Sequence, residues 1–177
     1  MSKKGAKVSS GDELEPRQRE SSEIQIRDIR KEETAKAAQL VARLKRLNGE
    51  FDPLLKTTES LEEEARKTLE KAVSNADSLV LVALSGSKVV GVVKADIKDR
   101  TYYEPRKEGA IDEFYILPEY RRGSLGRDLL SSMNDRLKGK GAELITAEFP
   151  SQNEIAKRFY TKLGFRSLTN VYAKAES

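Results

Sequence analysis

The sequence predicts a mixed α/β fold, a single domain in which about six β-strands are flanked by four helices. Short runs rich in β-branched and aliphatic residues, such as residues 79–84 and 88–97, have the length and composition of strands. Between such runs apolar residues recur every three or four positions, as Leu125, Leu129 and Met133 do, which is the spacing of one helix face. A chain of 177 residues also fits one domain of ordinary size.

The N-terminal part of the chain is expected to hold a tail, one strand and two helices. Residues 1–22 carry five basic and four acidic side chains with almost no apolar ones, which predicts a disordered tail. Residues 23–29 alternate apolar and polar side chains, as a half-buried strand does. An apolar helical stripe follows at residues 35–47, with Asn48-Gly49 as its stop signal, and a second helix is predicted at residues 60–75.

The rest of the chain is expected to contain five strands and two helices. The first two strands, at residues 79–84 and 88–97, should form an antiparallel hairpin because only Ser85-Gly86-Ser87 separates them. The third strand stops before Pro118, which cannot continue a ladder of backbone hydrogen bonds. A helix to Lys138 follows. The last predicted elements are a strand at 144–147, a helix at 153–162 that Gly164 ends, and a strand at 165–172.

The loop between the third of these strands and the next helix has the chemistry of an anion site. The first N–H groups of a helix have no internal partner and lie at the positive end of its dipole. A phosphate placed there accepts hydrogen bonds from these groups and interacts favourably with the dipole. Gly123 and Gly126 allow close backbone approach, and Arg121, Arg122 and Arg127 add positive charge. The alternative is an ordinary charged turn that caps the helix.

Residues 118–126, Pro-Glu-Tyr-Arg-Arg-Gly-Ser-Leu-Gly, resemble the acetyl-CoA pyrophosphate loop of the GNAT superfamily of N-acetyltransferases, (Gln/Arg)-x-x-Gly-x-(Gly/Ala). Ser124 departs from the pattern, because it stands where the family has its first glycine. The predicted order of strands and helices is also that of the GNAT fold, so the resemblance covers residues 23–175 and implies a GNAT domain at 23–177 with a mixed, mostly antiparallel sheet. It implies acetyl-CoA as cosubstrate, bound by Arg121, Arg122, Gly123, Ser124, Leu125, Gly126 and Arg127.

The segment from Asn153 to Phe165 is similar to a second family signature, Asn-x-x-Ala-x-x-x-Tyr-x-x-x-Gly-Phe. Seven residues are nearly two helical turns, so Asn153 and Tyr160 should share one face about 10 Å apart along the axis. The resemblance implies that Asn153 bonds the pantetheine arm and that the Tyr160 hydroxyl protonates the leaving thiolate. The alternative is a core tyrosine and a helix N-cap. The resemblance also implies that pantetheine pairs with the backbone of Phe114, Tyr115 and Ile116.

Acetylation of an amine needs a base, because an ammonium has no lone pair to attack a thioester. Glu113 is a first candidate for this base. It is expected to share a strand face with Ile111 and Tyr115, while Asp112 faces away. Burial in that face would raise the pKa of the Glu113 carboxyl toward neutrality.

Glu148 is the second candidate base. It shares a predicted strand face with Leu144 and Thr146, so partial burial is expected there too. It also matches the acid five residues before the asparagine in ribosomal-protein N-terminal acetyltransferases, which this end of the chain resembles. The alternative for both acids is that they are solvated or paired with Arg121 or Arg127.

Composition excludes several other classes of protein. The chain has no Cys and no His, so disulfides and thiol chemistry are excluded, and no metal is predicted, because no Asp-rich calcium loop is present. Thirty-three basic and 29 acidic residues nearly cancel to +4, so nucleic acid is not an expected partner. Neither a membrane-spanning apolar run nor a secretory signal is present, which predicts a cytoplasmic protein without a membrane partner.

These features together predict an acetyltransferase that binds acetyl-CoA and an amine acceptor, and transfers the acetyl group directly because no cysteine can carry it. The competing class is a noncatalytic acyl-CoA-binding module with the same fold. The acceptor is left open among a protein N-terminus, a lysine, a polyamine and an aminoglycoside. By resemblance it would approach the loops at 50–55 and 102–104, whose acids and aromatic rings suit a cation. A homodimer is also left open.

Overall fold

The computed structural model describes residues 23–175, and the tail predicted for residues 1–22 lies outside that range. The strands are β1 (Ile24–Asp28), β2 (Ser78–Ser85), β3 (Lys88–Asp99), β4 (Lys107–Ile116) and β5 (Leu144–Ala147). The helices are α1 (Thr34–Phe51), α2 (Leu61–Val73), α3 (Leu125–Gly139) and α4 (Glu154–Lys162). None of the helices in this described range is long and apolar enough to cross a membrane.

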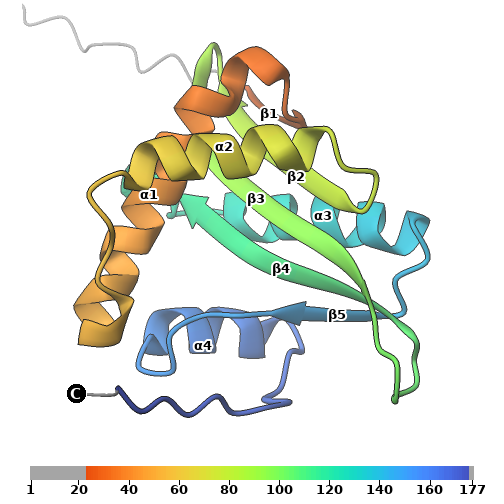
Figure 1. Ribbon diagram of the computed structural model, residues 1–177. Helices are drawn as coiled ribbons and strands as arrows, with labels where there is room; N and C mark the ends of the chain where they lie inside the picture. The colour runs from red at the N-terminus through yellow and green to blue at the C-terminus, as the bar shows by residue number, and fades with distance from the viewer. Residues whose placement is uncertain (1–22, 176–177) are drawn as a thin grey trace, which may run out of the picture.

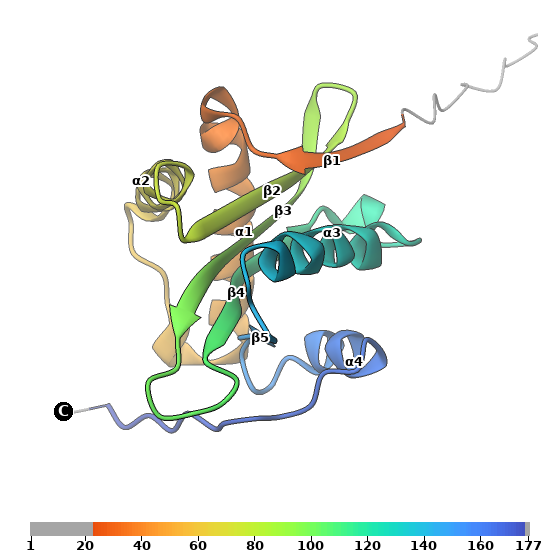
Figure 2. The same cartoon turned by 90° about the vertical axis from the view of Figure 1, so that its right-hand side faces the viewer.

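The strands form one mixed sheet in the order β1-β2-β3-β4-β5, in which only the β4–β5 pair is parallel. Helices α1 and α2 cover one face of the sheet, and α3 and α4 lie on the other (Figures 1 and 2). The predicted mixed sheet with four flanking helices is confirmed, with five strands in place of six. The predicted apolar stripe of α3, Leu125, Leu129, Met133 and Leu137, is buried as predicted, and α3 packs on the sheet.

The sixth strand, predicted at residues 165–172, is absent from the sheet. Residues 165–175 form no helix or strand, and most of their side chains are exposed, including Leu168, Val171 and Tyr172. Strand propensity describes how well side chains fit a half-buried, paired surface. In the described structure this segment has no paired strand, and after Phe165 its side chains have no packed face, so its apolar pattern alone does not make it a strand.

Helix α1 continues past the predicted stop signal at Asn48-Gly49 and ends at Phe51. Asp52, which precedes Pro53, has an extended backbone, as residues before proline prefer. Gly49 lies inside the helix, where an added Cβ would lie 3.2 Å from the carbonyl oxygen of Leu55. The glycine therefore serves close packing of the loop after α1 and does not end the helix.

A β-bulge in β4 changes which side chains share a face of the sheet. Lys94 of β3 lies opposite Glu113, but the next residue, Ala95, lies opposite Ile111, so Asp112 is an extra residue in the ladder. Glu113 therefore does not share a face with Ile111, contrary to the prediction. The prediction that Asp112 faces away from Glu113 is also wrong, because Asp112 accepts from Lys94 Nζ at 3.0 Å on the Glu113 side.

Strand β5 pairs with only the first half of β4. The parallel register ends at Ile111 and Ala147, and the last hydrogen bond runs from the N–H of Glu148 to the carbonyl of Ile111. Within the described structure, residues 112–116 of β4 consequently have a partner strand only on their β3 side. We call the region beside residues 112–116, where β5 no longer pairs with β4, the opening between β4 and β5. Backbone groups of β4 that point into this opening are free to pair with a ligand.

Candidate active site

The loop before α3 takes its special backbone conformation at Gly123. Gly123 has a φ of +131°, which side chains disfavour, whereas Ser124 has ordinary helical angles of −88° and −12°. The departure from the family pattern at Ser124 is therefore harmless to the backbone, because the neighbouring glycine supplies the conformational freedom. The Ser124 hydroxyl donates to Asp128 Oδ2 at 2.6 Å, so it bonds a carboxylate at the first turn of α3.

Six consecutive N–H groups in this loop and the first turn of α3 are free. The first N–H to bond backward is that of Asp128, which donates to the carbonyl of Ser124. The N–H groups of residues 122–127 donate to none of the described residues. Together with the positive end of the α3 dipole, they form a surface that is suited to bind an anion such as a phosphate, here called the anion-binding surface.

The three arginines of the loop differ in their surroundings. Arg121 Nε donates to the carbonyl of Ile116 at 2.8 Å, and its guanidinium lies 5.0 Å from the centre of the Tyr115 ring. Arg121 thus ties the loop to the end of β4. Arg122 and Arg127 are exposed and form no ion pair with any described residue, so their charge is available to an anion.

Gly126 allows α3 and α4 to pack closely, because a larger residue would crowd the Phe159 ring of α4. A Cβ added at Gly126 would lie 3.3 Å from the Phe159 ring and 3.6 Å from Ile116 Cδ1. The structure thus gives a packing reason for this glycine, while close approach to a phosphate stays a prediction. Leu125 is buried in the core, so only its backbone N–H can contribute to the anion-binding surface.

Gly123→Ala should weaken CoA binding about tenfold in calorimetry. A side chain at φ +131° strains the loop by about 1–3 kcal/mol, and relief of that strain moves the free N–H groups. Gly139→Ala is the matched control, because Gly139 ends α3 and an added Cβ meets no atom within 4 Å. Equal affinities for the two variants would contradict the importance of the loop conformation.

The ladder between β3 and β4 decides which backbone groups face the opening. The N–H of Leu117 bonds the carbonyl of Val90, and in an antiparallel ladder alternate residues point the same way, so Tyr115 also directs its backbone groups to β3. Phe114 and Ile116 direct theirs to the opening. Of the three residues predicted to pair with pantetheine, Phe114 therefore has an available N–H and carbonyl. Ile116 has an available N–H only, because its carbonyl accepts from Arg121, and Tyr115 has neither group available.

Tyr160 is buried in a cluster of four phenylalanine rings on the α3/α4 side of the sheet. Its ring centre lies 5.2 to 6.4 Å from those of Phe114, Phe149, Phe159 and Phe165. Burial raises the pKa of its hydroxyl far above the usual range, so the phenol stays protonated. None of the described residues hydrogen-bonds this hydroxyl, which leaves it able to donate to a ligand.

The sequence after Tyr160 fixes the end of α4. Gly164 has a φ of +87°, its N–H bonds the carbonyl of Thr161, and the N–H of Phe165 bonds the carbonyl of Tyr160. This is a Schellman motif, which confirms the predicted helix stop at Gly164. Asn153 caps the other end of α4, where its side-chain oxygen accepts from the N–H of Ala156 at 3.0 Å. The amide nitrogen of Asn153 remains able to donate to a ligand.

Glu113 lies on the opposite side of β4 from the Tyr160 cluster, against α1. Its Oε1 is 2.9 Å from Lys45 Nζ, while its buried Oε2 has no hydrogen-bond partner in the described structure. Burial raises the pKa of this carboxyl above its usual range, Asp112 adds to the rise, and Lys45 opposes it. A buried carboxylate with one unpaired oxygen is suited to bind and deprotonate an amine.

Glu148 differs from Glu113 because it lies just beyond the end of β5 and is exposed. The predicted partial burial of Glu148 is therefore wrong, since the strand ends one residue too early to cover it. Lys45 is a residue of this site that no feature of the sequence indicated. Its position on the polar side of a helix is shared with many surface lysines, so no pattern distinguished it before the contact with Glu113 was seen.

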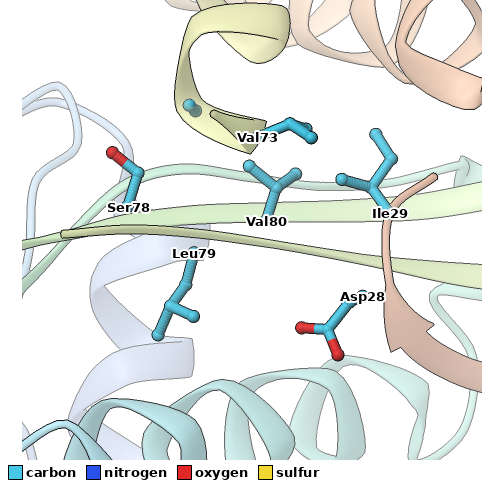
Figure 3. A pocket seen from close by; sticks show the side chains of 7 residues that line it. Asp28, Ile29, Val73, Ser78, Leu79 and Val80 are labelled. Carbon is cyan, nitrogen blue, oxygen red and sulfur yellow. The ribbon is translucent and has the colours of Figure 1, made fainter. Parts of the chain in front are cut away.

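Two hollows lie outside this arrangement. One of about 110 Å³ lies beneath α2, where Ile29, Val73 and Val80 gather, and none of the predicted site residues lines it (Figure 3). The other, of about 430 Å³, lies beside the end of α1, where Glu50 is accompanied by the cations Arg46 and Lys56. The acceptor loop predicted at 50–55 thus borders a hollow with mixed charge.

The acetyltransferase (GNAT) family profile matches residues 41–165, which include β4, the loop, α3 and α4. The chain belongs to the GNAT acetyltransferase family. Members of this family are acetyltransferases that use acetyl-CoA, which agrees with the class that the sequence resemblance predicted. The noncatalytic module was the competing prediction, and family membership favours the enzyme.

Known relatives agree with this assignment. The chain is 32% identical over 93 residues to N-alpha-acetyltransferase 30 of Schizosaccharomyces pombe, a match that covers 51% of this chain and 59% of that protein. An aminoglycoside N-acetyltransferase solved with CoA has a TM-score of 0.73 at 14% identity, covering 89% of this chain and 97% of that one. An acetyltransferase of Clostridium acetobutylicum solved with acetyl-CoA has a TM-score of 0.72 at 13% identity, covering 87% and 96%. Both of these solved structures have the same fold as this chain.

Proposed function

We propose that this GNAT acetyltransferase moves an acetyl group from acetyl-CoA directly to a primary amine at the opening between β4 and β5. The main support for the proposal is the position of residues 112–116 of β4. Some of their backbone groups are free, and the two faces of the sheet beside them present different chemical groups. On the α3/α4 side are the free N–H groups of the loop and the Tyr160 hydroxyl. On the α1/α2 side is the buried carboxylate of Glu113.

In this proposal acetyl-CoA binds from the α3/α4 side. The N–H groups of residues 122–127 and the side chains of Arg122 and Arg127 hold the pyrophosphate. The free backbone groups of Phe114 and the free N–H of Ile116 pair with pantetheine, and the Asn153 amide donates to the same arm. The thioester then lies near Tyr160, whose protonated hydroxyl can donate to the sulfur as negative charge develops there.

The acceptor amine binds from the α1/α2 side, where Glu113 removes its proton. The unpaired Oε2 is a buried hydrogen-bond acceptor, which an incoming ammonium can satisfy once the side chains that cover it move aside. The raised pKa of Glu113 brings the base closer to the pKa of an amine, which favours proton transfer. The chain has no cysteine to form an acetyl-enzyme intermediate, so the amine attacks the thioester itself.

The acceptor class is tested by following free thiol released from acetyl-CoA with a panel of amines. The panel contains a peptide with a free N-terminus, an N-terminally blocked lysine peptide, a polyamine and an aminoglycoside. We expect thiol release above background with at least one of them, and we place the peptide N-terminus first because the sequence relative is named an N-alpha-acetyltransferase. Protection from heat by CoA without thiol release for any amine would contradict the proposal.

A further inference from the structure

We infer that Lys45 is itself an acceptor, so that this protein acetylates the Nζ of Lys45 within its own chain. The inference rests on the proposed role of Glu113 as the base. A general base must lie within hydrogen-bond reach of the amine that it deprotonates. Lys45 Nζ lies 2.9 Å from Glu113 Oε1, so this nitrogen already has the distance that an acceptor amine requires.

Lys45 is the lysine near Glu113 that is free to react. Lys94 of β3 also faces this region, but it is 7% exposed, and its Nζ is bound by Asp96 at 2.6 Å and by Asp112 at 3.0 Å. The Lys45 side chain is 38% exposed, and Glu113 is the one carboxylate with which it forms an ion pair in the described range. Lys45 can therefore move toward a thioester without leaving several carboxylates unpaired.

The position of the ion pair on the sheet also favours this reaction. Glu113 lies in residues 112–116, the part of β4 that β5 leaves unpaired. The Lys45 nitrogen consequently contacts the base on the acceptor side of the opening, opposite the anion-binding loop and the Tyr160 cluster. An external amine would have to displace Lys45 from Oε1 or bind at Oε2.

The proposed step balances in atoms and charge. The Lys45 ammonium gives one proton to the Glu113 carboxylate, and the neutral Nζ forms a bond to the carbonyl carbon of the acetyl thioester. The carbon–sulfur bond then breaks, and the second proton of the amine accompanies the departing sulfur. The products are acetylated Lys45 and the free thiol of CoA. Acetylation removes the lysine charge, so Glu113 then faces an external amine without a competing ammonium.

The test is peptide mapping by mass spectrometry after incubation of the full chain with acetyl-CoA and no other amine. We expect one acetyl group on Lys45, added at a rate that is independent of protein concentration, as an intramolecular reaction requires. Glu113→Gln should slow this modification about 10²-fold. Lys36 is the internal control, because it is exposed on the same helix and forms no ion pair with any described residue.

Tyr160→Phe provides a second test from a different element and should slow acetylation of Lys45 as well. Lys45→Arg keeps the charge next to Glu113 and should abolish the modification, whereas Lys36→Arg should leave it unchanged. Thiol release with an external amine but no acetyl group on Lys45 would overturn this inference alone. Lys45 acetylation that is equally fast in Glu113→Gln would also overturn it. Loss of both reactions would overturn the proposed function too.

Discussion

Glu113→Gln should lower turnover by about 10²-fold or more at neutral pH. The amide keeps the shape of the carboxyl group but cannot accept a proton from an ammonium. The deficit should shrink as the pH rises, because a larger fraction of the acceptor amine is then already neutral. Steady-state thiol release across a pH series measures both effects.

The pH dependence of the wild-type protein follows from the raised pKa of Glu113. A base works only when it is deprotonated, so turnover should fall as the pH drops through this raised pKa. The fall should begin at a higher pH than an exposed glutamate would give. In Glu113→Gln this dependence should be replaced by that of the acceptor amine, so that turnover rises with pH as far as the pKa of the amine.

Glu148→Gln is the matched control for this prediction. Glu148 is an exposed carboxylate beyond β5, so its replacement should change turnover little. A large loss in Glu148→Gln with an active Glu113→Gln would move the base to the other candidate. If neither variant slows turnover, water deprotonates the amine and neither carboxylate is the base.

Tyr160→Phe should lower kcat by about 10²-fold while the KM for acetyl-CoA changes little. Departure of the CoA thiolate develops negative charge on sulfur, and a positioned phenol stabilises that charge only in the transition state. Burial keeps the Tyr160 hydroxyl protonated, and none of the described residues uses it. The hydroxyl can therefore act as a donor without breaking an existing bond.

The variant should also leave folding nearly unchanged. The phenylalanine ring retains the contacts with Phe114, Phe149 and Phe165 that hold α4 on the sheet. Thermal unfolding and CoA calorimetry check this point. An undiminished kcat together with a lower melting temperature would show that Tyr160 is a structural residue only.

Most of the fold could be predicted because its signals are local. The apolar stripe of α3, the hairpin turn before β3 and the stop at Gly164 depend on spacing and on single residues, and the structure confirms them. The prediction of a strand at 165–172 was wrong, because a strand-like sequence pattern does not form a strand without a partner strand. The predicted helix stop at Gly49 was wrong for a similar reason, because the role of this glycine depends on a loop that packs against the helix.

The site was harder to predict because its geometry depends on pairing between strands. The residue types around Asp112 do not predict a β-bulge, yet this one extra residue places Ile111 and Glu113 on opposite faces of the sheet. Likewise, the ladder with β3 uses the backbone of Tyr115, which a motif match cannot show. Lys45 comes from a distant helix, and only the folded contact connects it to Glu113.

A crystal structure of the protein with CoA would test the central claim most directly. We expect the pyrophosphate on the N–H groups of residues 122–127, and pantetheine beside Phe114 and Ile116. The thiol should lie about 3–3.5 Å from the Tyr160 hydroxyl, the range of a reactive contact. CoA bound with its thiol away from the opening between β4 and β5, or with its pyrophosphate away from the loop before α3, would contradict the account.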